Sequence, residues 1–231
     1  MNDKKIGIIG GMGPEATAYY YTQMIKLTGA HKDQDHFRVY IDSNAKVPDR
    51  TAAILGKGPS PVPYILESIA WMNREGIDEA FIPCFTSHYF FQEYVDHAEF
   101  TLHNAFTVCN TYLREHLPEV KKVGVLATTG TRSTRIFDRY LSEVEVIYPS
   151  VEDQENKVMK ANYDPEIGIK GGRTEAESID LLNEAANGLI AQGATCIIAG
   201  CTEIGLVLRP HHCAVPLIDP MLLTVLEIIK P

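Results

Sequence analysis

The sequence predicts an α/β protein built from two similar domains, each a parallel β-sheet flanked by helices. Short apolar runs alternate with helical patterns along the chain, which is typical of right-handed βαβ units. One offset, 117 residues, separates Lys4-Lys5 from Lys121-Lys122 and also Cys84 from Cys201. Two matches at one offset indicate an internal repeat. The 231 residues suffice for two domains of about 100–120 residues each.

Strands are predicted where a short run is mainly apolar, as in strands buried on both faces. Lys5–Gly10, with three isoleucines, opens the first half, and Val123–Ala127 opens the second. The predicted strands are Lys5–Gly10, Phe37–Asp42, Phe81–Pro83, Val123–Ala127, Val144–Tyr148, Cys196–Ala199 and Leu217–Asp219.

Helices are predicted where apolar residues recur at helical spacing between start and stop signals. Pro14 suits a first helical turn with Glu15 near its positive end, and Gly193 is a good stop. The predicted helices are Pro14–Leu27, Tyr64–Glu75, Tyr89–Tyr94, Asn104–Leu117, Thr134–Leu141, Val151–Lys160, Thr174–Gln192 and Met221–Ile229. Loops are predicted at Gly10–Pro14, Val47–Thr51 and Asn162–Arg173.

Composition narrows the class of protein. With 45% hydrophobic residues and a net charge of -9, the chain is typical of globular proteins, and a nucleic-acid or anionic-membrane partner is not expected. No signal peptide and no apolar run long enough to span a membrane is recognised. Five cysteines, an odd number, without a secretion signal indicate reduced thiols and a cytoplasmic protein.

Cys84 and Cys201 are the main candidates for chemistry. A cysteine after an apolar strand is ordinarily a small core residue, and Cys109 and Cys196 fit that interpretation. Cys84 and Cys201 instead follow strands at strand-to-helix turns, where N–H groups and the helix dipole favour a thiolate. Ligands of parallel sheets collect at these carboxyl ends. Two thiols in similar halves suit proton removal from one face of a carbon and delivery to the other.

Two other kinds of site compete with a thiol pair. A structural zinc site needs close ligand pairs such as C-x₂-C, and the cysteines of this chain are further apart, so no metal site is expected. Gly11-x-Gly13-x-x-Ala16 fits a dinucleotide fingerprint, with Asp42 where a ribose-binding acid would lie. Pro14, however, removes an N–H that should hold pyrophosphate. A nicotinamide-dependent dehydrogenase is therefore the alternative enzyme.

Several motifs together resemble the aspartate/glutamate racemase family, which needs no pyridoxal phosphate, and are closest to its aspartate racemases. The resemblance runs nearly end to end. Its motifs are G-G-M-G-P-E-A-T (Gly10 to Thr17), P-D-R-T (Pro48 to Thr51), P-C-F-T-S-H-Y-F-F (Pro83 to Phe91), L-A-T-T-G-T (Leu126 to Thr131), G-I-K-G-G (Gly168 to Gly172) and G-C-T-E-I (Gly200 to Ile204).

The resemblance implies two α/β domains, pseudo-two-fold related, with the active site in the cleft between them. The first would comprise 1–103 plus 209–231 and carry Cys84; the second, 104–208, would carry Cys201. Cys201 would act on the L isomer and Cys84 on the D isomer. The substrate-binding positions implied are Met12, Thr86, Thr129 and Thr131 for the amino-acid carboxylate, Arg50 and Lys170 for the side-chain carboxylate, and Thr202 and Glu203 after the second cysteine.

One departure concerns Phe85, which stands where the family has Asn in P-C-N-T. Asn can hydrogen-bond a polar group of the substrate and Phe cannot, so Phe85 either lines the substrate site or turns into the core. We expect a cofactor-independent racemase of aspartate or glutamate. Its expected small-molecule partner is an acidic amino acid, and it is expected to form a homodimer. A non-catalytic amino-acid-binding protein is the alternative outside enzymes.

Overall fold

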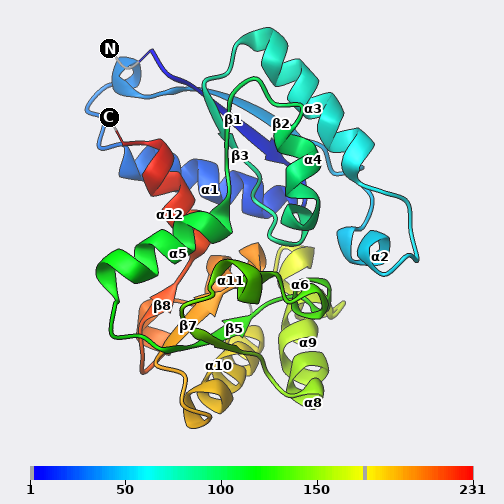
Figure 1. The fold of residues 1–231 in the computed structure, drawn as a ribbon, viewed down its shortest axis with the longest axis vertical. Helices are drawn as coiled ribbons and strands as arrows, with labels where there is room; N and C mark the ends of the chain where they lie inside the picture. Colours follow the sequence, from blue (N-terminus) through cyan, green and yellow to red (C-terminus); the bar gives the residue numbers. More distant parts are fainter. Residues whose placement is uncertain (1–2, 174–175, 231) are drawn as a thin grey trace. The chain divides into compact units, whose positions relative to one another are not determined.

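The computed structural model describes residues 3–173 and 176–230. The chain divides into two compact units, Met1–Val108 with Met221–Pro231, and Cys109–Pro220. Each unit contains one parallel four-stranded sheet flanked by helices (Figure 1). The predicted α/β class with two parallel sheets is confirmed.

The first unit has the strand order β2-β1-β3-β4, and every neighbouring pair is parallel. Its strands are β1 (Lys5–Gly10), β2 (Arg38–Ser43), β3 (Glu79–Phe81) and β4 (Thr101–His103). Its helical segments are α1 (Pro14–Leu27), the 3₁₀ turn η1 (Asp33–Asp35), α2 (Arg50–Ile54), α3 (Val62–Glu75), the 3₁₀ turn η2 (Thr86–Phe90) and α4 (Phe91–Val95).

The central strand β1 is covered by helices, since α1 and α3 both contact it. Ile6 and Ile8 are fully buried as a result. The C-terminal helix α12 (Pro220–Ile228), red in Figure 1, belongs to this unit from Met221 onward. Lys4 Nζ donates a hydrogen bond of 2.8 Å to the carbonyl of Ile228, which links β1's start to the end of the chain.

The second unit has the order β6-β5-β7-β8, again with parallel pairs. Its strands are β5 (Lys122–Leu126), β6 (Glu145–Ile147), β7 (Cys196–Ala199) and β8 (Leu217–Ile218). Helix α5 (Ala105–His116) leads into it. The other helical segments are α6 (Thr129–Thr134), α7 (Ile136–Tyr140), α8 (Val151–Asp153), the π-helical η3 (Gln154–Met159), α9 (Lys160–Tyr163), the 3₁₀ turn η4 (Ile169–Gly171), α10 (Ala176–Ala191), α11 (Thr202–Val207) and the 3₁₀ turn η5 (Pro210–His212).

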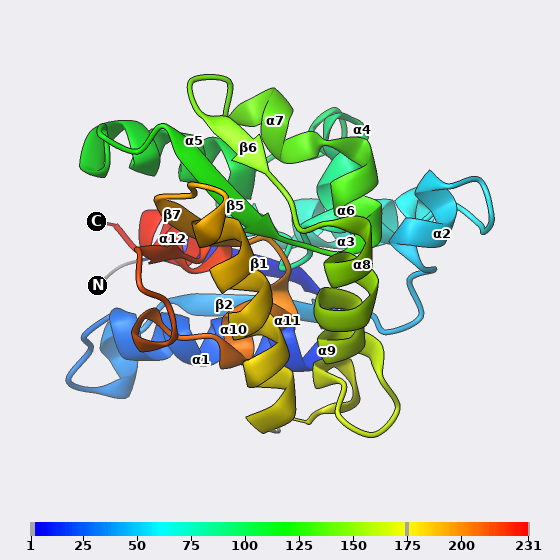
Figure 2. The same ribbon diagram turned by 90° about the horizontal axis from the view of Figure 1, so that it is seen from below.

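Helix α10 forms the main cover of the second sheet. It contacts β5 and β7 and also the continuous run of η3 and α9, which lies beside it in Figure 2. Leu182 and Leu189 of α10 are fully buried and join one hydrophobic cluster with Ile197 of β7. The predicted start of this helix, Thr174, lies outside the described residues.

The internal repeat is visible in the sheets. A shift of 117 residues carries Lys5, where β1 begins, onto Lys122, where β5 begins, and Glu79 of β3 onto Cys196 of β7. Both sheets place the opening strand second in the order. In each sheet the chain first winds to one side and then to the other, so a topological switch point lies between β1 and β3 and between β5 and β7.

Several boundaries differ from the sequence prediction. The third strand ends at Phe81 and not at Pro83, because proline has no N–H to donate to a sheet ladder. The predicted loop Val47–Thr51 contains the start of α2, where the Asp49 side chain caps the helix by accepting from Ala52 N. Because β8 pairs with β7, residues 209–220 lie with the second unit, although we expected them in the first.

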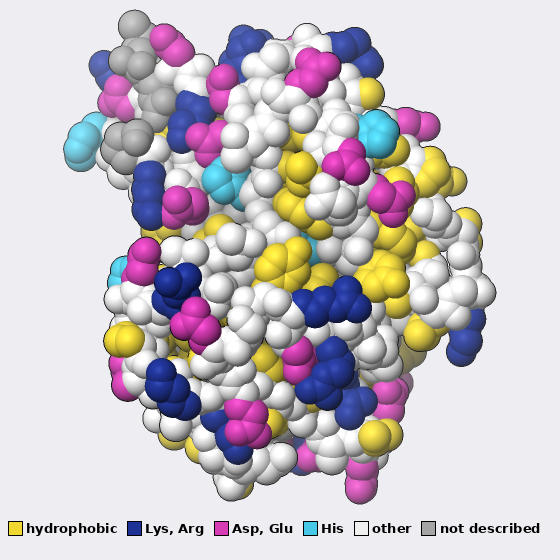
Figure 3. Space-filling model, viewed as in Figure 1, with side chains coloured by type: hydrophobic (Ala, Val, Ile, Leu, Met, Phe, Trp, Pro, Cys, Tyr) yellow, Lys and Arg dark blue, Asp and Glu magenta, His cyan; other side chains and the backbone are white. Residues whose placement is uncertain are grey.

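No helix within the described residues is long and apolar enough to cross a membrane. Across the described residues of the face in Figure 3, Lys and Arg side chains are interspersed with Asp and Glu. This arrangement is unlike the continuous basic face of a nucleic-acid-binding protein.

Candidate active site

The first candidate half-site lies at the switch point of the first sheet. Cys84 follows β3 by three residues and is 5% exposed. Its N–H donates to the carbonyl of Ile82 at 2.7 Å, which bends the chain sharply before η2. The next turn begins with Thr86, which is 9% exposed. The thiol is thus held in a short turn between a buried strand and a helical segment.

Phe85 packs into an aromatic cluster of the first unit. It is 2% exposed, and its ring centroid lies 5.7 Å from that of Phe106 and 6.4 Å from that of His88. The Phe106 contact is edge-to-face, an arrangement that favours aromatic pairs. Of the two interpretations of Phe85 left open by the sequence, this packing favours a core residue.

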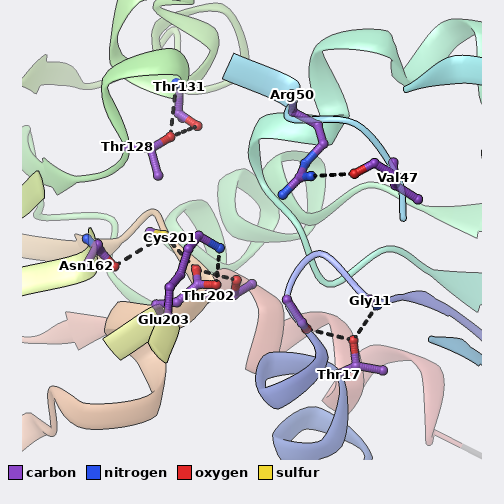
Figure 4. A network of polar contacts seen from close by, with 12 residues as sticks. Gly11, Thr17, Val47, Arg50, Thr128, Thr131, Asn162, Cys201, Thr202 and Glu203 are labelled. Atoms are coloured by element: carbon purple, nitrogen blue, oxygen red, sulfur yellow. Dashed lines mark hydrogen bonds and ion pairs between the residues drawn. The ribbon is translucent and has the colours of Figure 1, made fainter. Parts of the chain in front are cut away.

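The glycine turn after β1 forms the other side of this switch point. Gly11 has φ +87, and a Cβ there would approach the backbone of Asn44 to 2.3 Å, so only glycine fits. Its N–H donates to Thr17 Oγ1 at 2.9 Å, and that hydroxyl donates to the Gly13 carbonyl at 3.0 Å (Figure 4). Met12, between the glycines, is 2% exposed.

These bonds bear on the dinucleotide alternative. The Gly11 N–H, which a pyrophosphate would need, is already directed at Thr17. The carboxylate of Asp42, which a ribose would need, accepts a bond of 2.6 Å from Ser68. Both groups that a dinucleotide would need are therefore already engaged in hydrogen bonds within the protein.

Arg50 opens α2 near the same edge of the first unit. Its Nη1 donates to the carbonyls of Val47 at 3.3 Å and Pro48 at 3.0 Å. These two bonds orient the guanidinium group, whose planar shape is matched to a carboxylate. Figure 4 shows the Arg50 side chain beside Val47.

The second candidate half-site surrounds Cys201, which is 5% exposed at the N-terminus of α11. Its Sγ donates to Glu203 Oε2 at 2.9 Å and contacts Asn162 Oδ1 at 3.8 Å. Thr202 Oγ1 donates to the same Glu203 oxygen at 3.0 Å, and Lys170 Nζ lies 2.5 Å from Glu203 Oε1. Figure 4 shows Cys201 and Thr202 beside the Glu203 carboxylate, with Asn162 on the other side of the Cys201 sulfur.

This arrangement separates the protonation states of its members. Burial raises the pKa of the Cys201 thiol well above its ordinary value, and the Glu203 charge raises it further, against the opposing effect of Lys170. Burial alone would raise the pKa of Glu203, but the Lys170 charge and hydrogen bonds from Cys201 and Lys170 lower it below its ordinary value. At neutral pH, Cys201 is a thiol that donates to a carboxylate.

The predicted threonines follow β5 on the other side of the second switch point. Thr128 caps α6; its hydroxyl accepts from Thr131 N at 3.4 Å and donates to Thr131 Oγ1 at 3.2 Å. Thr131 is 1% exposed, whereas Thr129 is half-buried and donates to Glu155 at 3.1 Å. The structure thus brings Thr129 and Thr131 to the same strand end, in different surroundings.

Sequence reasoning missed two residues that contact the thiol-bearing turns. Asn162, fully buried, reaches Cys201 from the end of α9, where the sequence predicts only the start of a loop. His88 bonds the Cys84 carbonyl, a contact that the local sequence pattern does not indicate. The positions of Asn162 and His88 along the sequence do not by themselves predict these contacts. Within the described residues, no group of three or more His, Cys, Asp or Glu side chains could hold a metal ion.

The comparisons with known proteins concern the family and the fold of the chain. The family model for Asp/Glu/hydantoin racemases matches residues 9–228. The broad-specificity amino-acid racemase RacX of Bacillus subtilis (strain 168) is 27% identical over 234 residues, 93% of this chain and 92% of the relative. The aspartate racemase of Picrophilus torridus superposes with a TM-score of 0.79 at 24% identity, over 98% of this chain and 94% of its own. An aspartate racemase homologue from Pyrococcus horikoshii OT3 gives 0.77 at 21% identity, over 99% and 100%.

Proposed function

Because this chain belongs to the Asp/Glu/hydantoin racemase family and is thus an isomerase of the racemase class, we propose that it interconverts L- and D-aspartate, or glutamate, without a cofactor. The observation that carries the proposal is the repeated placement of a thiol. Cys84 and Cys201 each follow the strand beside a switch point, in two sheets of the same order. A single structural cysteine would not need such a repeat.

The proposed chemistry uses one thiol as base and the other as acid. A thiolate takes the α-proton from the substrate, which leaves a carbanion and a thiol, and the other thiol returns its own proton to the opposite face. One bond to hydrogen breaks and another forms, with no net change of charge. Since Cys201 rests as a thiol beside Glu203, it is ready to deliver a proton; to act as the base it must first lose one.

Arg50 and Lys170 support an acidic substrate. Arg50 carries a charge oriented by backbone carbonyls, and its planar fork suits a carboxylate. Lys170 is paired with Glu203, so a substrate carboxylate would share the Lys170 ammonium group with the Glu203 carboxylate. Met12, Thr86, Thr129, Thr131 and Thr202 remain proposed contacts of the amino-acid end, and the enzyme is proposed to be a cytoplasmic homodimer.

The proposal is tested by incubating the purified protein with each L-amino acid in D₂O. We expect the α-proton NMR signal of aspartate or glutamate to disappear while chiral chromatography detects the D isomer. If acidic amino acids bind but show neither exchange nor inversion, the protein is an amino-acid-binding member of the family instead. Light scattering of the same sample tests the dimer.

A further inference from the structure

His88 is a buried polar residue four positions after Cys84. It is 2% exposed and lies in η2, one turn from the thiol. Its Nδ1 lies 2.9 Å from the carbonyl oxygen of Cys84. Its Nε2 lies 3.4 Å from the backbone nitrogen of Ala105, the first residue of α5. The imidazole therefore bridges the cysteine turn and the start of another helix.

The two partners determine the tautomer. The backbone N–H of Ala105 can only donate, so Nε2 accepts and carries no proton. Nδ1 then holds the ring's proton and donates it to the Cys84 carbonyl. A protonated ring would have two donors and would lose the Ala105 bond.

The surroundings keep the ring in place and uncharged. The His88 ring stacks on Phe91 with centroids 5.3 Å apart and planes 8° apart, and it meets Phe106 edge-on at 5.4 Å. Burial lowers the pKa of His88 from 6.5 to about 4, against the opposing effect of the Cys84 carbonyl. At neutral pH His88 is neutral, so it is unsuited to act as an acid on the substrate.

We propose that His88 is a positioning residue for Cys84: its neutral imidazole fixes the Cys84 turn against the start of α5 and thereby orients the thiol for proton transfer. This inference rests on the proposed racemase function. It predicts a defect confined to one half of the reaction, because Cys201 lies in a separate network with Glu203 and Asn162.

Two variants separate the hydrogen bond from the packing. His88→Phe keeps an aromatic ring for Phe91 and Phe106 but removes both polar contacts. His88→Asn can restore a donor near the Nδ1 position. Each is made in a Cys201→Ala background, where Cys84 is the remaining catalytic thiol, and in a Cys84→Ala background. The control is His97→Phe. His97 is exposed, and its Nδ1 also contacts the carbonyl oxygen of the residue four positions earlier, Glu93.

In the Cys201→Ala background we expect His88→Phe to slow α-proton exchange by about 10²-fold, the effect of a misplaced catalytic group. His88→Asn should recover much of that loss. In the Cys84→Ala background, His88→Phe should leave the exchange rate unchanged, as His97→Phe should in both. Equal losses in the two backgrounds, or no loss in either, would overturn the proposal.

A second measurement does not depend on racemase activity. Iodoacetamide labelling followed by peptide mass spectrometry measures each thiol separately. We expect His88→Phe to change the labelling rate of Cys84 severalfold and to leave that of Cys201 as in the parent. If no amino acid exchanges but Cys84 labelling changes alone, the racemase function fails and the positioning role stands. Unchanged Cys84 labelling refutes the positioning role.

Discussion

At the scale of single residues, the network of Cys201, Glu203 and Lys170 determines whether the Cys201 thiol keeps its proton. Glu203 is 3% exposed, yet it holds a charge because Lys170 lies 2.5 Å away. A buried carboxylate without such a partner would be neutralised. The same carboxylate accepts the Cys201 S–H at 2.9 Å. Lys170, which the family resemblance assigns to the side-chain carboxylate of the substrate, thus also sets the charge beside the thiol.

Replacing Glu203 should ease the ionisation of Cys201. Glu203→Gln removes a charge that raises the Cys201 pKa, so iodoacetamide labelling of this thiol should begin at lower pH than in the parent. Glu177→Gln, which replaces an exposed glutamate paired with Lys160, is the control. Labelling of Cys201 in Glu203→Gln at the parental pH or above would contradict this electrostatic assignment.

Arg50 makes the prediction about substrate charge. Arg50→Ala should lower kcat/KM for aspartate by about 10- to 100-fold, since a charge-assisted contact contributes about 1.5–3 kcal/mol. Arg50→Lys keeps the positive charge but loses the planar guanidinium fork, so its kcat/KM should lie between those of the parent and Arg50→Ala. Steady-state kinetics of these variants, with exposed Arg139→Ala as control, measure the effect. Parent-like turnover of aspartate by Arg50→Ala would remove Arg50 from the site.

At the scale of elements, the turn between β1 and α1 depends on Thr17. This hydroxyl, 2% exposed, accepts from Gly11 N and donates to the Gly13 carbonyl. Thr17→Val leaves the buried Gly11 N–H without that acceptor, so the free energy of unfolding should fall by about 1–3 kcal/mol. Thr22→Val on the same helix removes an exposed bond to Ala18 and should change it by no more than about 0.5 kcal/mol. Urea unfolding compares them; equal losses would show that the turn does not need the hydroxyl.

The free energy of unfolding should depend on pH through His88, which is buried in the segment η2. The unfolded chain binds a proton at this residue near its ordinary pKa of 6.5, whereas the folded chain resists it until about 4. The stabilisation is therefore complete above pH 6.5 and is lost as the pH falls toward 4, a total of about 3 kcal/mol.

His88→Phe should remove this part of the acid sensitivity, while exposed His97→Phe should retain it. Urea unfolding from neutral pH down to about pH 4 measures the slope. If the parent and His88→Phe lose the same stability over this range, the buried imidazole is not responsible.

At the scale of the whole molecule, the repeat was the most informative feature of the sequence. Strands β1, β3, β5 and β7 were predictable because they are apolar and central, and the common offset places β1 with β5 and β3 with β7. The edge strand β4, Thr101–His103, was missed because it is short and partly exposed, so its local pattern carries no strand period.

The candidate site was predictable only in part, for a similar reason. Motif positions indicated Cys84 and Cys201, but not which neighbours their side chains would contact. Asn162 reaches Cys201 from 39 residues away, and Phe85 packs on Phe106 of α5. Such contacts depend on how helices pack, which periodicity along the chain does not encode.

The central claim is that Cys84 and Cys201 act as two separate bases, and single replacements test it most directly. Chiral analysis and α-proton exchange in D₂O are measured for Cys84→Ala and Cys201→Ala with each enantiomer of aspartate, and half-buried Cys213→Ala is the control. We predict that neither variant racemises aspartate, that Cys84→Ala exchanges only the L isomer and Cys201→Ala only the D isomer, and that Cys213→Ala behaves as the parent. Racemisation at the parental rate by Cys84→Ala or Cys201→Ala would contradict the two-base mechanism.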